Sequence, residues 1–277
     1  MKKIITLLTI GLFATSVNAQ DLPQTSPSSK INQTVGLTDF SIEYSRPSVK
    51  GRPIFGDLVP FDKVWRLGAN KCTQFTASTD VMIAGSTVSA GTYAVFATPT
   101  KSGEWTVVFN SNTEQWGAGD YDTTKDVATA KVKSVKNTFN ETLTIGFNTL
   151  TANSGVISIQ WENLRVDVPF SVNTVKIADQ NIANAIEKGE KLEDVYSNSA
   201  DYYMGTKDNT KALMYVEKSI SLEKTHKNVY LKAKILNEMG KKDEAIKLAK
   251  EAVKLAEKAE SKGWANYITE NIEKWSK

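Results

Sequence analysis

The sequence has very few of the residues that metal centres and nucleophilic active sites require. Its 277 residues include a single Cys, Cys72, and a single His, His226. One Cys excludes an intramolecular disulfide and a cysteine zinc cluster, and one His excludes any site built on two His ligands. The formal net charge is only +3, which gives no indication of a nucleic-acid-binding protein. We therefore expect no metal, no cofactor and no nucleic-acid partner.

Long apolar runs are equally scarce, and the one apolar run that stands out lies at the N-terminus. Residues 4–14 are almost entirely apolar, follow Lys2 and Lys3, and precede the small residues that end at Ala19. This order is typical of a secretory signal peptide, here residues 1–19, with cleavage after Ala19. The run is too short to span a bilayer as a helix, so we expect no membrane span. The sequence thus predicts a periplasmic or secreted protein.

The composition changes near residue 172. All seven Pro and all ten Phe lie before residue 171, and residues 173–277 contain no Arg. Residues 20–172 carry 13 Lys+Arg and 14 Asp+Glu, whereas residues 173–277 carry 19 Lys and 17 Asp+Glu. Such a shift marks a boundary between domains. We therefore predict two domains after the signal peptide, residues 20–172 and residues 173–277.

The first domain alternates apolar and polar residues with period two, as strands do. Phe40, Ile42 and Tyr44 form one such set, and Leu143, Ile145 and Phe147 form another. Eight or nine short runs of this kind predict an antiparallel β-sandwich or jelly-roll-like fold, with Glu162-Asn163 as a tight link between two strands. Residues 46–71 are the exception. They contain three Pro, which exclude a regular central strand and predict a long ordered connection.

The second domain switches to helical periodicity. Ala212, Val216 and Ser219 share a face, and Ala245, Ala249 and Ala252 repeat the same offsets 33 positions later. Residues 239–245 resemble the turn within a tetratricopeptide repeat, which predicts helix pairs; a plain helical bundle is the alternative. Gly residues punctuate the pattern at positions expected to be helix ends. The predicted helices cover residues 174–188, 191–204, 208–222, 226–239, 241–259 and 262–275.

The most unusual feature of the sequence is its distribution of Arg. The chain has four Arg, and three of them, Arg46, Arg52 and Arg66, lie in the irregular segment. The guanidinium group offers a planar, bidentate fork that Lys cannot supply. One interpretation is an anion site bordered by Tyr44, Trp65 and Asn70. The other is structural, with the Arg side chains satisfying carbonyls or carboxylates, such as those of Asp57 or Asp62, in a loop that lacks ladder bonds.

A second candidate loop contains Trp116, Tyr121 and Asp122 among Gly residues. Exposed aromatic rings on such a loop can stack against sugars, so an exposed Trp116 would favour carbohydrate binding. The alternative is an aromatic loop folded back onto the edge of the sandwich. Asp120, Asp122 and Asp126 offer oxygen ligands, but the spacing does not fit a calcium loop, and we predict no metal there.

Catalytic signatures are absent from the sequence. No HExxH, GxSxG or Walker A pattern occurs, and His226 lies at a predicted helix start, where we expect it to be solvated. The remaining catalytic hypothesis is a glycan-directed hydrolase with paired carboxylates, which requires two acids across one cleft. The available loop acids are Asp57, Asp62, Asp120 and Asp122.

Several motifs resemble one known family when they are taken together. They are Tyr44-Ser45-Arg46-Pro47, Lys50-Gly51-Arg52, Trp65-Arg66-Leu67-Gly68-Ala69-Asn70 and Ala90-Gly91-Thr92-Tyr93. Over roughly residues 26–171 the chain resembles the domain of unknown function 2911 (DUF2911), and its helical half is similar to the repeat extension of some members. The resemblance implies a fold and an exported compartment. It supplies no catalytic residues.

These observations favour an exported, non-catalytic binding or scaffold protein of the bacterial cell envelope. In this hypothesis the helical repeats contact a partner protein, and the β domain holds a small anion or a carbohydrate near Arg46, Arg52, Arg66, Asn70, Trp65 and Tyr44. Two alternatives stay open: the glycan-directed hydrolase, and a purely structural β domain with binding confined to the helices.

Overall fold

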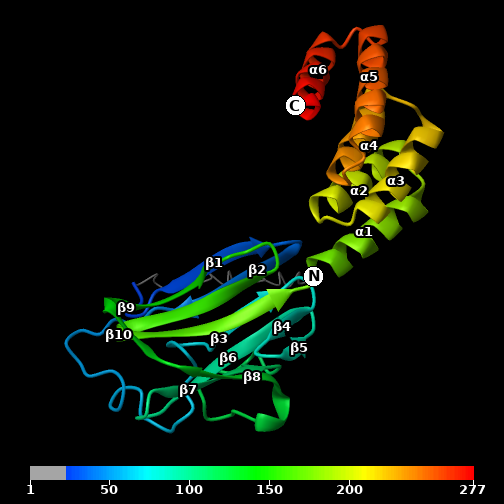
Figure 1. Ribbon diagram of the computed structural model, residues 1–277. Coiled ribbons are helices and arrows are strands. Elements are labelled where there is room, and N and C mark those ends of the chain that lie inside the picture. Colours follow the sequence, from blue (N-terminus) through cyan, green and yellow to red (C-terminus); the bar gives the residue numbers. More distant parts are fainter. Residues whose placement is uncertain (1–22) are drawn as a thin grey trace, which may run out of the picture. The chain divides into compact units, whose positions relative to one another are not determined.

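The computed structural model describes residues 23–277, so the predicted signal peptide lies outside the described residues. Within them the chain divides into two compact units, the first ending at Val172 and the second covering Asn173–Lys277 (Figure 1). The first unit consists of strands and the second of helices, as the switch in periodicity predicts. The two units are called the β unit and the helical unit below.

The β unit contains ten strands in two antiparallel sheets. The larger sheet has the order β1-β2-β3-β6-β7-β8 and the smaller sheet the order β5-β4-β10-β9. This architecture confirms the predicted antiparallel sandwich. The strands are β1 (Ser28–Val35), β2 (Thr38–Ser45), β3 (Thr73–Ala77), β4 (Val81–Ile83), β5 (Ser86–Val88), β6 (Gly91–Pro99), β7 (Glu104–Asn110), β8 (Asp126–Lys133), β9 (Val135–Asn148) and β10 (Ser154–Val172), with a short 3₁₀ turn, η1 (Thr123–Lys125), before β8.

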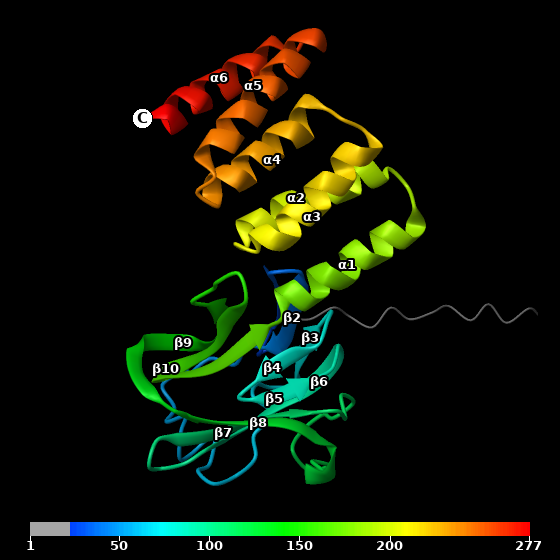
Figure 2. The ribbon, with the colours of Figure 1, turned by 45° about the vertical axis from the view of Figure 1, so that its right-hand side comes forward.

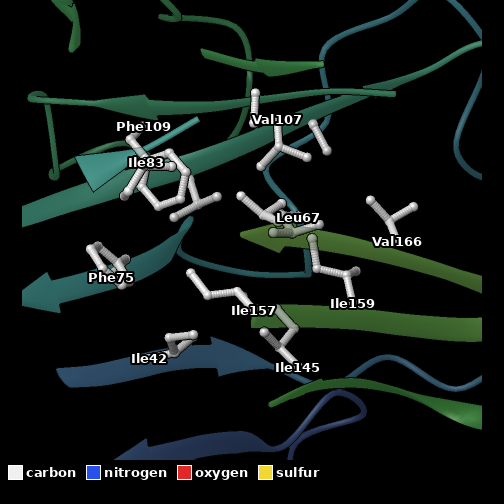
Figure 3. Close-up of a cluster of buried hydrophobic side chains, with 14 of the residues drawn as sticks. Ile42, Leu67, Phe75, Ile83, Val107, Phe109, Ile145, Ile157, Ile159 and Val166 are labelled. Carbon is white, nitrogen blue, oxygen red and sulfur yellow. The ribbon is translucent and has the colours of Figure 1, made fainter. Parts of the chain in front are cut away.

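The core of the β unit lies between the two sheets, because alternate residues of each strand point to one face. Phe40 of β2 contacts Phe170 of β10 across the sheets, with ring centroids 4.8 Å apart. Figure 3 shows part of this core, where Ile42 and Val107 of the larger sheet face Ile157 of the smaller sheet. Leu67, from the irregular connection, is only 1% exposed and packs in the same core.

The prediction of a tight link at Glu162-Asn163 is wrong, because β10 is one continuous strand of 19 residues. Glu162 adopts a positive φ of 53°, and the pairing of β10 with β9 shifts register on both sides of it. These features describe a bulge, which bends a strand and increases its twist without reversing the chain. A local pattern of polar residues does not distinguish such a bulge from a turn.

The free edge of β9 is covered by the chain that follows β2. The hydroxyl of Tyr44 donates to the carbonyl of Ile145 at 3.2 Å and accepts from its N–H at 3.0 Å. Two residues earlier on β9, Leu143 donates its N–H to the Pro47 carbonyl, and its own carbonyl accepts from Nε of Arg46. On an edge strand, the backbone N–H and carbonyl groups of every second residue point away from the sheet. On β9 these groups of Ile145 and Leu143 each have a hydrogen-bond partner in the covering chain.

The irregular segment then crosses from the smaller sheet to the larger one. Its first part lies on β9, where the N–H of Val49 donates to the Glu141 carbonyl at 2.7 Å. Its later part lies on β6, where Trp65 and Ala97 exchange both backbone hydrogen bonds at 2.8 Å. The segment therefore closes one side of the sandwich with backbone pairing at both ends, although it contains only isolated bridges.

The helical unit contains six helices, each within a residue of its predicted bounds at the N-terminal end. They are α1 (Thr174–Lys188), α2 (Leu192–Gly205), α3 (Asn209–Leu222), α4 (His226–Glu238), α5 (Lys242–Lys258) and α6 (Lys262–Ser276), and Figure 2 shows them as successive antiparallel neighbours. Gly189 and Gly240 end helices with positive φ values of 72° and 79°. Gly205 and Gly263, also predicted at helix ends, lie inside the terminal turns. None of the helices in residues 23–277 is both long and apolar enough to cross a bilayer.

Small residues allow the helices to pack closely. Ala245, Ala249 and Ala252 of α5 are fully buried, as are Ala212 and Val216 of α3. These are the faces that the repeated offsets predict. The residues that repeat in the sequence are thus the ones that are buried between helices.

The connection between α3 and α4 is held by a buried amide. Asn228 donates to Oγ of Ser219 at 3.1 Å and to the Glu223 carbonyl at 2.6 Å, and it completes a capping box with Thr225. His226, expected to be solvated, instead packs its ring against Trp264. Burial lowers the pKa of its imidazole.

Candidate functional site

Two neighbouring pockets lie on the β unit, beside the irregular segment. The first, called the polar pocket, has a volume of about 540 Å³. The second, called the cationic pocket, has a volume of about 310 Å³. Both values fall in or near the range of small-ligand sites. The polar pocket is lined by Pro23, Gln24, Thr25, Ser26, Ser28, Glu43, Tyr44, Ser45, Asn70, Lys71, Cys72, Gln74 and Trp116; the cationic pocket by Thr25, Ser26, Pro47, Ser48, Lys50, Arg52, Leu58, Val59, Trp65, Arg66, Gly68, Ala69 and Trp161.

The cationic pocket gathers positive charge without negative charge to balance it. Lys50, Arg52 and Arg66 line it, and its walls contain neither Asp nor Glu. Within residues 23–277, no carboxylate forms an ion pair with any of these three side chains. Glu141 approaches the segment at Lys50, where its Oε1 accepts from the backbone N–H at 2.9 Å. The positive charge of these three side chains is therefore not balanced by an ion pair.

Two hydrogen-bond donors in the walls of this pocket lack partners among the described residues. They are Nε of Arg66 and Nε1 of Trp161, and both atoms are buried. Trp161 as a whole is only 2% exposed. Buried donors are nearly always paired in folded proteins, so each unpaired one requires an explanation. Both residues line the cationic pocket, but the two unpaired atoms themselves are closed off from solvent.

The walls are held in place by the aromatic cluster of the core. The rings of Trp65 and Trp161 stack with centroids 5.7 Å apart, and Nε1 of Trp65 donates to the Gly68 carbonyl at 3.0 Å. Arg52 uses Nε on the Val49 carbonyl at 3.0 Å and Nη2 on the Ser48 carbonyl at 2.6 Å. A guanidinium has five N–H donors, so Arg52 is anchored and still has donors to offer.

The polar pocket differs from its neighbour in its lining. Amide and hydroxyl side chains predominate, and Glu43 is its sole carboxylate. Trp116 is 72% exposed, which is the exposure that the carbohydrate interpretation requires. The hydroxyl of Tyr44 is occupied by the backbone of Ile145, so this residue contributes to the wall rather than donating to a ligand.

The two pockets share a wall formed by Thr25 and Ser26. This wall is tied down by Asn70, whose Nδ2 donates to the Ser26 carbonyl at 3.3 Å and to Oγ of Ser45 at 3.2 Å. Asn70 adopts a positive φ of 57°, a conformation that Asn tolerates better than most residues. Arg66 lines the cationic pocket and also lies near the polar pocket. Its Nη1 is beside Gly117, the residue that follows Trp116 in the chain.

The structure divides the residues predicted for the first site into three groups. Arg52, Arg66 and Trp65 line the cationic pocket, and Tyr44 and Asn70 line the polar pocket. Arg46 lines neither, because Nε and Nη2 bind the Leu143 carbonyl and Thr144 on β9. The partners of the predicted Arg cluster are thus carbonyls and hydroxyls. The predicted alternative partners, Asp57 and Asp62, form no ion pair with these Arg residues in the described chain.

Sequence reasoning missed Lys50 and Trp161. Lys50 lies between Arg46 and Arg52 in the sequence. Counting every positive residue of the segment, and not Arg alone, would have included it. Trp161 is 95 residues beyond Arg66 in the sequence and resembles any other core residue of β10. No local pattern indicates that its N–H lacks a partner.

The second candidate loop also divides. Trp116 is exposed, but Tyr121 folds back, with its hydroxyl 2.7 Å from Oδ2 of Asp126 and its ring against Phe96. Burial and the Asp126 carboxylate raise the pKa of the Tyr121 hydroxyl. Asp122 caps η1 by accepting from the N–H of Thr124, and hydrogen bonds from Thr124 lower its pKa. Tyr121 and Asp122 therefore shape the loop that presents Trp116.

Neither pocket brings together a pair of acids. Asp57, Asp62, Asp120 and Asp122 line neither of them. Within residues 23–277 no group of His, Cys, Asp and Glu side chains is arranged to hold a metal ion. Cys72 is a buried free thiol in the wall of the polar pocket, and burial raises its pKa.

The helical unit has a surface hollow of its own. It lies along α3, has a volume of about 650 Å³, and is lined by Thr210, Leu213, Met214, Glu217, Lys218, Ser221 and Met239. Met214 and Met239 are 43% and 39% exposed, which is high for apolar side chains in such a position. The hollow combines apolar contact area with charges at its rim.

Comparison with known families gives two matches. The family described as "Protein of unknown function (DUF2911)" matches residues 26–170, which is more than half of the chain. The tetratricopeptide repeat matches residues 193–226 and 227–258, which correspond to the pairs α2–α3 and α4–α5. These matches confirm the predicted resemblance and the predicted repeats. No curated protein and no solved structure shows a significant match to the chain.

Replacing Tyr44 with Phe tests whether its hydroxyl is structural. Tyr44→Phe leaves the N–H and carbonyl of Ile145 on β9 without their partner, so we expect the free energy of unfolding to fall by about 1–3 kcal/mol. Tyr93→Phe is the matched control, since it removes one hydrogen bond, to the Ser89 carbonyl. Urea unfolding monitored by Trp fluorescence measures both. A Tyr44→Phe protein as stable as the wild type would contradict this role.

Proposed function

We propose that this chain, which belongs to the DUF2911 family of proteins of unknown function, is an exported, non-catalytic binding protein of the bacterial cell envelope. In this proposal the β unit binds a small anion in the cationic pocket, and the tetratricopeptide repeats contact a partner protein. The observation that carries the proposal is the cationic pocket itself, with Lys50, Arg52 and Arg66 in its walls and no carboxylate.

The electrostatics of the pocket support anion binding. Three positive side chains around one concavity raise the local potential, and low-dielectric walls focus it. An anion in the pocket would accept charge-assisted hydrogen bonds from the Lys and Arg side chains that line it, and such bonds are stronger than neutral ones. Arg52 is already held by the Val49 and Ser48 carbonyls before any ligand arrives, so that binding requires less ordering of this side chain.

Carbohydrate binding at the polar pocket is the second candidate, and the exposure of Trp116 favours it. A ring that is 72% exposed beside amide and hydroxyl groups combines a stacking face with hydrogen-bonding partners. Sugars require both kinds of contact, because one face of the ring is apolar and its edge is polar. The cationic pocket suits a sugar less well, since the rings of Trp65 and Trp161 stack on each other.

The tetratricopeptide repeats indicate protein–protein interaction. Repeat helices present an extended surface that a partner can follow. We infer that the partner is another envelope protein, in agreement with the predicted signal peptide.

The glycan-directed hydrolase gains no support from the geometry. Hydrolysis with paired carboxylates requires two acids about 5–10 Å apart on one cleft. The polar pocket offers Glu43 alone, and Glu43 lies 3.7 Å from the ammonium of Lys30. Binding without catalysis is therefore the function that the two pockets favour.

Calorimetric titration tests the anion site. We expect the purified protein to bind at least one of inorganic phosphate, sulfate and acetate, and we expect Arg66→Gln to weaken that binding about tenfold or more. Arg165→Gln is the control, because Arg165 lines neither pocket and pairs with Asp167 at 3.1 Å. Absence of binding to all three anions, or equal affinity in the Arg66→Gln protein, would refute the anion site.

Titration with neutral oligosaccharides tests the second candidate. A sugar that binds the polar pocket should quench or shift the fluorescence of Trp116, and Trp116→Ala should abolish both the signal and the heat of binding. Because Trp116 is exposed, its removal should leave the unfolding temperature nearly unchanged. Binding that survives Trp116→Ala would place the sugar elsewhere.

Mass spectrometry of the protein expressed in a bacterium with a secretion pathway tests export. We expect the mature chain to begin at Gln20 and to appear in the periplasmic or extracellular fraction. Replacing the apolar residues Leu7 and Leu8 with Lys should leave the full-length chain in the cytoplasm. An intact N-terminus on the wild-type protein would contradict the proposed location.

A further inference from the structure

We infer that the cationic pocket is built for a phosphoryl group, bound as its dianion. The inference rests on the proposed anion site and goes further, because it names the chemical class of the ligand. Three features of the pocket lead to it: the amount of positive charge, the spread of the donors over several elements, and the polar pocket beyond the shared wall.

The charge of the pocket exceeds what one carboxylate can balance. Lys50, Arg52 and Arg66 supply three positive charges, and none of them is paired with a carboxylate of residues 23–277. A carboxylate or a sulfate ester carries one negative charge. A phosphomonoester carries up to two above its second pKa of about 6. By charge, a phosphomonoester therefore matches the pocket better than a single carboxylate or a sulfate ester does.

The donors also approach from different parts of the fold. Lys50 and Arg52 come from the part of the irregular segment that follows the β9 contact, and Arg66 comes from the part that follows the β6 contact. Ser26 and Ser48 add hydroxyl groups to the same walls. A planar carboxylate has two oxygens to offer such a set of donors. A phosphoryl group has three, arranged in three dimensions, and can engage donors from several walls at once.

The polar pocket gives the rest of a phosphorylated molecule a place to lie. Thr25 and Ser26 belong to both pockets, and the glycine loop after Trp116 runs beside the Arg66 guanidinium. A phosphoryl group in the cationic pocket could thus carry a polyhydroxylated group across the wall to Trp116. Free phosphate and a sugar phosphate share the chemistry that the cationic pocket recognises, and they differ in whether the polar pocket is used.

A matched pair of probes tests the inference by calorimetry. Methyl phosphate and methyl sulfate have the same shape but differ by one charge at about pH 7.5, and we expect methyl phosphate to bind about tenfold or more tightly. Lowering the pH to about 5 converts most of the phosphate ester to its monoanion, so its affinity should fall about tenfold, whereas that of methyl sulfate should not change.

Variants and further probes complete the test. Lys50→Gln should reduce the difference in affinity between methyl phosphate and methyl sulfate. Lys63→Gln is the control and should leave that difference unchanged, because Lys63 is on the same segment but outside both pockets. Tighter binding of glucose 6-phosphate than of inorganic phosphate supports a sugar phosphate, and equal binding supports free phosphate; either agrees with a phosphoryl site. Equal affinity for methyl phosphate, methyl sulfate and acetate would overturn the inference while leaving the anion site intact. No binding of any anion would overturn both.

Discussion

The exposed backbone of β9 is the constraint on which the rest of the β unit depends. An edge strand presents unpaired N–H and carbonyl groups every second residue, and such an edge invites pairing with other chains. This protein covers the edge with the chain that leaves β2, through the side chains of Tyr44 and Arg46 and the backbone of Pro47 and Val49. The cover cannot be a regular strand, because Pro47 lacks an N–H and Arg46 contributes through its side chain. A long irregular segment is the result.

The same segment builds the cationic pocket. Once its first residues are fixed on β9 and Trp65 is fixed on Ala97 of β6, the residues between them must cross the opening of the sandwich. There they meet the aromatic cluster around Trp161, whose rings give the pocket a rigid floor. Structural and binding roles are thus divided within one stretch of sequence: Arg46 serves the edge, whereas Arg52 and Arg66 face the pocket.

The sequence predicts the fold well because the fold follows from local periodicity. The alternation around Ile145 and Ile157 predicts strands, and the Ala positions of α5 predict buried helix faces. It predicts the site less well, because the site depends on distant pairings. Arg46 and Arg52 are the same type of residue in the same irregular segment. Their different roles follow from which carbonyls of the folded chain lie within reach of each side chain. The missing partner of Trp161 is likewise a property of packing, which no motif encodes.

The wall shared by the two pockets has a practical consequence for work with this protein. Thr25 and Ser26 lie close to the start of the described chain and are held by a few contacts, including those of Asn70 and the bond from the Arg46 N–H to the Pro27 carbonyl. An affinity tag fused just ahead of this stretch would lie next to residues that line both pockets. Tags, immobilisation chemistry and fluorescent labels therefore belong beyond α6, at the end of the helical unit, which contributes no residue to either pocket.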